Sequence, residues 1–251
     1  VSAFLLNRSS DLATSFAIML LDIQMFLAND RFVLSWFNGS NSVFLDGWMS
    51  ALTSGFTWVA LYASLFYLVV KNNETMKQIM LVVGCALACV ALADIMADVI
   101  VKPLVERWRP SNDPIFKYDV AVVDGYRGSS YGFFSAHAAN TFSLALFFCM
   151  VVRSRVLSVA LVLWSLINCY TRMYLGLHYP SDIVCGILWG SVCAIGVYFF
   201  YLRVSRKMFG EDNYVSTQYT STGYRLCDVD IVVLVLVSTV LITLFRALFI
   251  Y

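Results

Sequence analysis

Long apolar runs are the feature of this chain that most restricts its fold. Each run is close to the ~20 residues that an α-helix needs to cross the ~30 Å hydrocarbon core of a membrane. Only 13% of the 251 residues are charged, whereas soluble domains carry about 25%. We therefore expect an all-α, polytopic membrane helix bundle of about six transmembrane helices. The predicted spans are residues 50–70, 78–101, 133–152, 156–171, 183–203 and 231–250.

The N-terminal part of the chain gives a weaker pattern. Residues 12–27 are apolar, but the run is short and Asp22 interrupts it. An interfacial or re-entrant helix fits this segment as well as a span does, and we expect an interfacial N-terminal helix. Six spans with short connections leave no room for a separate soluble domain. The prediction is therefore a single membrane-embedded domain over residues 1–251, with its motifs in residues 102–182.

The cysteines and the net charge give no sign of a further site. The seven cysteines are scattered, nearly all within or at the edge of apolar runs, and none has a plausible partner spacing. We interpret them as small apolar residues rather than as disulfides or metal ligands. The net charge of +1 gives no reason to expect a nucleic-acid partner.

Basic residues gather in alternate connections between the predicted spans. The positive-inside rule makes the side that carries them cytoplasmic. The opposite side carries residues 102–132 and 172–182, which we expect to face the periplasm, the cell exterior or an organelle lumen. Within it, the polar residues 110–132 form either a lid or a solvated loop. The basic connections, which fall on one side if the six spans alternate, are residues 71–77, 153–155 and 203–207.

Two polar residues mark the start of the fifth predicted span. His178 and Asp182 are four residues apart, on either side of Pro180, so both side chains can lie on one face where the helix begins. The carboxylate can then accept from one imidazole nitrogen and leave the other free to attack, as in an activated nucleophile. The alternative is a histidine that only caps a helix at the interface, which Asp182 and the second polar motif disfavour.

The second histidine, His137, lies at the predicted start of the third span. Backbone N–H groups at a helix N-terminus attract anions, and Ser135 adds a hydroxyl donor. His137 can act there as the general acid that protonates a leaving oxygen. A capping serine beside an interfacial histidine is the alternative, so this motif is weak on its own.

The end of the second span carries three cations, Lys102, Arg107 and Arg109. A phosphoryl group in its transition state needs several fixed donors, and arginine supplies a bidentate fork. The alternative is a set of cations that snorkel to the interface. Asp94 and Asp98 lie on the same helical stripe as Lys102. We expect Asp98 to pair with Lys102, because carboxylates in membranes are usually paired; a metal site here lacks further carboxylates at suitable spacing.

Together these residues resemble the signature of the type 2 phosphatidic acid phosphatase superfamily, which also includes vanadium haloperoxidases. Its pattern is Lys-x6-Arg-Pro, then Pro-Ser-Gly-His, then Ser-Arg-x5-His-x3-Asp. In this chain residues 102–110 read KPLVERWRP, residues 134–137 read FSAH and residues 171–182 read TRMYLGLHYPSD. The first segment matches completely. The departures in the other two are Phe134 for proline, Ala136 for glycine and Thr171 for serine.

The resemblance implies a role for each matched residue. His178 would be the nucleophile that becomes phosphorylated, Asp182 would orient it, and His137 would protonate the leaving group. Phosphatases of this family need no metal, and we expect no cofactor. The methyl group of Ala136 must fit where the backbone approaches the phosphate, and we expect activity to survive it. The phosphate would be bound by Lys102, Arg109, Ser135, Arg172 and the N–H of Ala136, with Asp98 behind Lys102.

The sequence thus predicts an integral membrane phosphatase that hydrolyses a phosphomonoester or diphosphate of a membrane lipid at the outer membrane face. The favoured substrate is undecaprenyl diphosphate or a phosphate of lipid A, in a bacterial inner membrane. Phosphatidylglycerol phosphate and phosphatidic acid are alternatives, and so is a transferase that passes the phosphate to a lipid or sugar acceptor. A non-catalytic binding or transport protein is disfavoured, because such a protein would have lost a catalytic residue and none is lost here. A haloperoxidase is disfavoured, because haloperoxidases are soluble and this chain is not.

Overall fold

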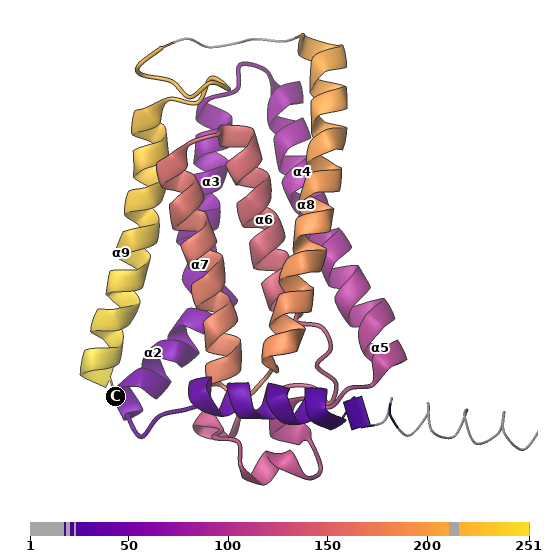
Figure 1. Cartoon of the computed structure of the whole chain (residues 1–251). Helices are drawn as coiled ribbons and strands as arrows, with labels where there is room; N and C mark the ends of the chain where they lie inside the picture. The colour runs from indigo at the N-terminus through magenta and orange to yellow at the C-terminus, as the bar shows by residue number, and fades with distance from the viewer. Residues whose placement is uncertain (1–17, 19–20, 23, 211–215, 251) are drawn as a thin grey trace, which may run out of the picture.

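The computed structural model describes residues 18, 21–22, 24–210 and 216–250, which form a bundle of long helices (Figure 1). No strand occurs among these residues, so the fold is all-α as predicted. The seven cysteines are free, as expected for small apolar residues. The helices are α2 (Val43–Thr53), α3 (Val59–Lys71), α4 (Met76–Asp94), α5 (Lys102–Val105), α6 (Ala136–Val152), α7 (Arg155–Tyr174), α8 (Pro180–Phe209) and α9 (Leu226–Ile250).

All six predicted spans are present as apolar helices, which make the chain an integral membrane protein. Among them, α6 is the shortest of the unbroken helices. α2 and α3 form one broken span, with a bend of 65° between them. The sequence predicts a span at 50–70 without this break. The break occurs at Ser54, because its extended backbone interrupts the helical hydrogen bonds. Four stretches are long and apolar enough to cross a membrane unaided: Met76–Val105, Arg155–Tyr174, Pro180–Phe209 and Leu226–Phe249.

The second span continues beyond its predicted end. α4 passes through a π-helical segment, Ile95–Val101, into α5, so that 30 helical residues run from Met76 to Val105. Glu106 then adopts a left-handed backbone conformation with a φ of 49° and ends the helix. Short π-helical segments within α-helices frequently occur at functional sites. This one contains Asp98 and leads directly into Lys102.

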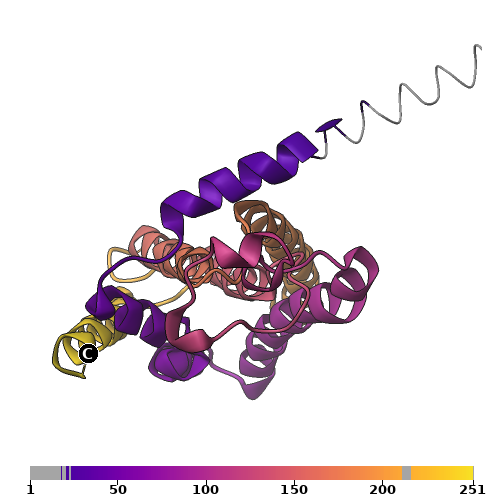
Figure 2. The same ribbon diagram turned by 90° about the horizontal axis from the view of Figure 1, so that it is seen from below.

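The expected interfacial helix is present on the N-terminal side of the chain. Residues 24–37 are helical and run across one end of the bundle (Figures 1 and 2). Large apolar side chains of this helix are exposed, including Met25, Phe32 and Trp36, as in helices that lie in the membrane interface. Part of the predicted segment 12–27 lies outside the described residues.

α6 occupies the centre of the bundle, where it packs against α4, α7 and α8. Its contact with α8 is close because small residues line it. A Cβ atom on Gly186 would lie 2.7 Å from the carbonyl oxygen of Ser135, and one on Gly190 would lie 2.5 Å from that of Ala139. Small residues four positions apart permit such approaches between membrane helices. The N-termini of α6 and α8 therefore meet, and the N–H of Ser135 donates to the carbonyl oxygen of Asp182 at 3.1 Å.

The two ends of the bundle carry different residues. The basic connections lie at one end, and the three motifs lie at the other, together with the helix at 24–37 (Figure 1). The connection 106–135 covers the motif end and is paired along its main chain. Gly132 donates to the carbonyl of Arg107 at 2.8 Å, and Arg109 donates to that of Ser130 at 3.1 Å. Residues 110–132 therefore form an ordered loop whose two ends are tied together.

The close contact between α6 and α8 predicts that alanine has different effects at two glycines of α8. Gly190→Ala places a methyl group against the backbone of Ala139, so the free energy of unfolding should fall by about 1–3 kcal/mol. Gly196→Ala is the matched control, because nothing lies within 4 Å of a Cβ atom there, and alanine is the better helix former. Thermal unfolding in detergent measures both. Equal melting temperatures would contradict the contact.

Candidate active site

The three motifs are far apart in the sequence but meet at one end of the bundle. Lys102 begins α5, Ser135 precedes α6, Arg172 lies in the last turn of α7, and His178 lies between α7 and α8. Each motif thus stands at a helix end, where polar groups can leave the hydrocarbon. The structure brings the predicted cations together around His178. Burial lowers the pKa of His178, and the charges of Arg109, Arg172, Lys102 and His137 act in the same direction.

His178 is the centre of this cluster. It is only 1% exposed, and its Nε2 atom lies 3.0 Å from Nη1 of Arg109. A guanidinium group only donates hydrogen bonds, so this contact requires an unprotonated Nε2. The proton of neutral His178 is then on Nδ1. Nε2 is therefore the ring nitrogen that has a free lone pair.

Asp182 faces the other nitrogen of His178, but at a longer distance than a hydrogen bond. Its Oδ2 atom lies 3.7 Å from Nδ1 of His178, whereas N–H···O bonds span about 2.7–3.2 Å. The carboxylate oxygens have other donors. Oδ2 accepts from the N–H of Tyr179 at 2.9 Å, and Oδ1 accepts from Nη1 of Arg107 at 2.8 Å. Asp182 is thus a fixed negative charge beside His178 and not the hydrogen-bond partner that the spacing predicts.

Arg109 and Arg172 are two buried cations that have no carboxylate within 4 Å in the described part of the chain. Each is 6% exposed. Arg109 donates to the hydroxyl of Ser129 at 3.0 Å and to the carbonyl of Leu177 at 3.2 Å. Arg172 donates to the hydroxyl of Thr53 at 2.8 Å. Buried charges are normally paired, so these two guanidinium groups suit an anion such as a phosphate group, which arginine binds with its fork.

The N-terminus of α6 adds further donors. Ser135 is fully buried, and its Oγ atom accepts from the N–H of Ala138 at 3.3 Å. The hydroxyl proton of Ser135 remains available to an anion, and the N–H of Ala136 belongs to the first turn, where N–H groups lack partners within the helix. Ala136 and Phe134, two departures from the family pattern, are buried in one small apolar cluster with Ala97. Both side chains therefore contribute to the packing at the start of α6.

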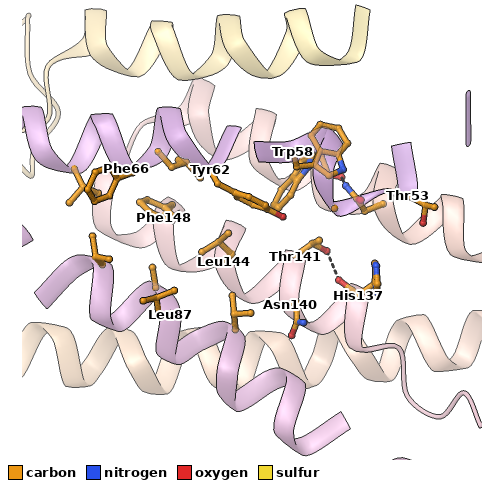
Figure 3. Close-up of a pocket in the computed structure, with 18 residues that line it drawn as sticks. Thr53, Trp58, Tyr62, Phe66, Leu87, His137, Asn140, Thr141, Leu144 and Phe148 are labelled. Atoms are coloured by element: carbon orange, nitrogen blue, oxygen red, sulfur yellow. Dashed lines mark hydrogen bonds between the residues drawn. The ribbon is translucent and has the colours of Figure 1, made fainter. Parts of the chain in front are cut away.

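His137 lines an apolar pocket (Figure 3). The pocket has a volume of about 510 Å³ and lies between α3, α4, α6 and α7. Its polar end holds His137 and Thr53, the residue that accepts from Arg172. Its other end is walled by aromatic side chains such as Phe66 and Phe148. This volume and lining are typical of a site for an apolar ligand.

Lys102 forms the ion pair that its spacing from Asp98 predicts. Asp94, one turn earlier, accepts a hydrogen bond from the side-chain amide of Asn140 at 2.9 Å. The two carboxylates of this span therefore have separate partners. Among the residues that the structure describes, no three His, Cys, Asp or Glu side chains are grouped as a metal ion would require.

Burial lowers the pKa of His178 well below its usual range, and the nearby charges of Arg109, Arg172 and Lys102 lower it further. Burial also lowers the pKa of Arg109, although a guanidinium group remains charged at neutral pH. The cations that can bind a phosphate therefore also keep His178 neutral. Neutral imidazole is the form with a free lone pair, so the same charges suit an anion and favour the nucleophilic form of His178.

The family pattern gives no role to two residues beside the site, Asp30 and Arg107. Arg107 belongs to the group of three cations, but the family pattern leaves its position open. Asp30 comes from the helix at 24–37, is 7% exposed, and its Oδ2 atom lies 2.5 Å from Nη2 of Arg107. The only signal for Asp30 is that a carboxylate beside an apolar run is costly unless paired. That signal does not identify its partner.

The fold and the site define a membrane-embedded helix bundle with an anion-binding cluster at its helix ends. The family profile of the PAP2 superfamily matches residues 80–206, a range that contains all three motifs. The chain belongs to the PAP2 superfamily.

Two curated relatives are similar to most of this chain. A protein of Bacteroides thetaiotaomicron named lipid A 4'-phosphatase is 45% identical over 181 residues, which are 71% of this chain and 80% of the relative. A protein of the same name from Porphyromonas gingivalis is 32% identical over 209 residues, which are 81% of this chain and 87% of the relative. No solved structure gives a significant match.

The charges around His178 predict that its imidazole stays neutral well below the usual histidine pKa of about 6.5. The sequence has two histidines, so His137→Gln leaves His178 alone in a protein purified without a histidine tag. Its imidazole ¹⁵N shifts should remain those of the Nδ1-protonated neutral form through the pH range in which a free imidazole titrates. Arg109→Gln removes one cation and should raise the titration midpoint. A midpoint near the usual value before that substitution would contradict the electrostatics of the site.

Proposed function

We propose that this chain removes a phosphate group from lipid A through a phosphohistidine formed on His178. The chain is a membrane lipid phosphatase, as its superfamily and its two relatives indicate. The observation that carries the proposal is a neutral, buried His178 beside Arg109 and Arg172, at the polar end of an apolar pocket. The guanidinium groups suit a phosphate, and the pocket suits the chain of a lipid.

The first step transfers the phosphoryl group to His178. Nε2 attacks the phosphorus atom and forms an N–P bond, while the bond between phosphorus and the lipid oxygen breaks. That oxygen leaves with the electron pair and takes a proton from His137, the general acid, which becomes protonated once the negative charge of the bound phosphate offsets the nearby cations. Arg109, which contacts Nε2 in the structure, donates to phosphate oxygens in the complex. Arg172 and Lys102 stabilise the charge that develops on these oxygens.

The second step releases inorganic phosphate. A water molecule attacks the phosphorus of the phosphohistidine, the N–P bond breaks, and its electron pair returns to Nε2. His137, which is neutral after the first step, takes a proton from this water as general base. Asp182 stays beside Nδ1 throughout, where its negative charge stabilises the positive charge of the phosphorylated ring.

Lipid A is the substrate that the relatives favour. Both are named for the 4'-phosphate of lipid A, and we propose the same phosphate for this chain. The names support neither undecaprenyl diphosphate, phosphatidylglycerol phosphate nor phosphatidic acid. The position of His137 at the boundary between the arginines and the apolar pocket suits protonation of the oxygen that joins phosphate to lipid.

We infer that the motif end of the bundle faces the periplasm of a bacterial inner membrane. The basic connections lie at the opposite end, which the positive-inside rule assigns to the cytoplasm. Both relatives are bacterial proteins. The helix at 24–37 would then lie on the periplasmic surface of the membrane, at the depth of the lipid head groups.

Removal of either histidine should abolish most of the activity. His178→Ala removes the nucleophile and should lower kcat by roughly three to six orders of magnitude. His137→Ala removes the general acid and should lower kcat by about 10²- to 10⁴-fold. Phosphate release in detergent is measured with lipid A, undecaprenyl diphosphate, phosphatidylglycerol phosphate and phosphatidic acid. Lipid A should give the highest kcat/KM.

Trapping of the intermediate distinguishes hydrolysis from transfer. Lipid A labelled with ³²P in the phosphate should leave an acid-labile label on the wild-type protein and none on His178→Ala. The label should then be released as inorganic phosphate even when a lipid or sugar acceptor is present. Its recovery on the acceptor would identify a transferase. Near-wild-type turnover of His178→Ala would show that the mechanism is wrong.

Obstruction of the apolar pocket should affect lipid substrates alone. Leu144→Trp enlarges a side chain in the pocket wall and should lower kcat/KM for lipid A about tenfold or more, since overpacking costs about 1–3 kcal/mol. Hydrolysis of the soluble substrate para-nitrophenyl phosphate should not change. Leu234→Trp is the matched control, because Leu234 lies on α9 and is 65% exposed. Equal losses with both substrates would mean that the pocket does not hold the lipid.

A further inference from the structure

A polar network joins Asp182 to the N-terminal helix, residues 24–37. Nη1 of Arg107 donates to Oδ1 of Asp182 at 2.8 Å and to Oγ of Ser181 at 2.7 Å. Nη2 of the same guanidinium group donates to Oδ2 of Asp30 at 2.5 Å. The guanidinium carbon also lies 4.2 Å from the ring centroid of Tyr179, within the range of a cation–π contact. One cation therefore bridges two carboxylates and is held on several sides.

Asp30 also caps the helix that carries Asp182. Its Oδ1 atom accepts from the N–H of Ser181 at 3.0 Å, and its Oδ2 atom accepts from the Ser181 hydroxyl at 2.5 Å. Ser181 is the second residue of α8, where N–H groups have no partner within the helix. Caps normally come from the residue that precedes the helix, but this one comes from 151 positions earlier. The N-terminal helix therefore fixes the start of α8.

We propose that Asp30 and Arg107 are positioning residues that act on the reaction through Asp182, an inference that rests on the proposed function. Arg107 holds Oδ1 of Asp182, and this leaves Oδ2 facing Nδ1 of His178 at 3.7 Å. Asp30 in turn holds Arg107 and the first turn of α8. The interfacial helix is thereby a part of the active site as well as a contact with the membrane.

The burial of the two carboxylates makes this arrangement necessary. Asp30 is 7% exposed and Asp182 is 0% exposed, and like charges in a buried site repel each other. The guanidinium group of Arg107 between them compensates both. Without it, Asp182 would turn its carboxylate away or take a proton, because an uncompensated buried charge is costly. In either case the phosphorylated ring of His178 would lose its stabilising negative charge.

The N-terminal helix has further anchors that do not touch Asp182. Nη2 of Arg31 lies 2.9 Å from Oδ2 of Asp113, but that carboxylate also accepts from the hydroxyl of Tyr179 at 3.2 Å, so this ion pair is joined to the network. At the end of the helix, the side chain of Asn38 accepts from the N–H of Ala121 at 2.7 Å and donates to its carbonyl at 3.0 Å. These contacts attach the helix to the loop at 110–132. Attachment of the helix and positioning of the carboxylate can therefore be separated by mutation.

The test uses Asp30→Asn and Arg107→Lys, with Asn38→Ala as the control, because the side chain of Asn38 attaches the helix through the backbone of Ala121. Asp30→Asn keeps the shape but removes the charge that holds Arg107, and Arg107→Lys keeps the charge but loses the fork. Phosphate release from lipid A gives kcat and KM, and thermal unfolding in detergent reports folding. We expect kcat to fall about 10- to 100-fold in both variants, because displacements of about 1 Å cost this much. KM should change little, and Asn38→Ala should retain wild-type kcat.

Combination with Asp182→Ala identifies the path of the effect. If Asp30 and Arg107 act through Asp182, neither substitution lowers kcat further once Asp182 is replaced. Asp30→Glu, which retains the charge, should recover part of the rate that Asp30→Asn loses. A further fall of kcat in the Asp182→Ala background would overturn the proposal.

Two other results would also overturn it: equal losses in Asp30→Asn and Asn38→Ala, or losses that only follow the amount of folded protein. Failure of the proposed function would appear separately, as near-wild-type turnover of His178→Ala. In that case no phosphohistidine would form on His178, and the role proposed for Asp30 and Arg107 would not apply, whatever their own variants show.

Discussion

The close approach of α6 and α8 is the contact on which the candidate site depends. Gly186 and Gly190 let the two backbones meet, and the N–H of Ser135 then reaches the carbonyl of Asp182 at 3.1 Å. One helix N-terminus supplies hydrogen-bond donors for an anion, while the other begins just after His178. His178, the proposed nucleophile, and these donors therefore lie close together because two glycines lack side chains.

Charge organises this volume in a second way. Arg109 and Arg172 are buried, and their hydrogen bonds go to hydroxyl and carbonyl groups instead of carboxylates. Neutral partners fix the two side chains but leave their positive charge uncompensated, so it remains available to an anion. Fixed charges of this kind need no rearrangement when a reaction develops negative charge. Burial and the same cations keep His178 neutral. The buried charge of the arginines therefore also favours the form of the imidazole that has a free lone pair.

The sequence predicts the helices and the local spacing within each motif, but not the contacts between distant segments. Apolar runs fix the spans, because a helix is the structure that satisfies its backbone inside lipid. The contact of Asp30 with Arg107 joins residues 77 positions apart, and no periodicity encodes it. The distance of 3.7 Å between His178 and Asp182 also differs from the expected hydrogen bond. The carboxylate of Asp182 instead accepts hydrogen bonds from Tyr179 and Arg107, which the spacing alone does not reveal.

The break in the first span joins the anion site to the apolar pocket. Thr53, the last residue of α2, accepts from Arg172 and also lines the pocket. The chain then turns by 65°, and α3 continues along the pocket wall with Tyr62 and Phe66. A single backbone segment thus sets the distance between the cation and the first apolar contacts. We therefore expect the site to favour a lipid whose phosphate lies close to its chains over one with a long polar spacer.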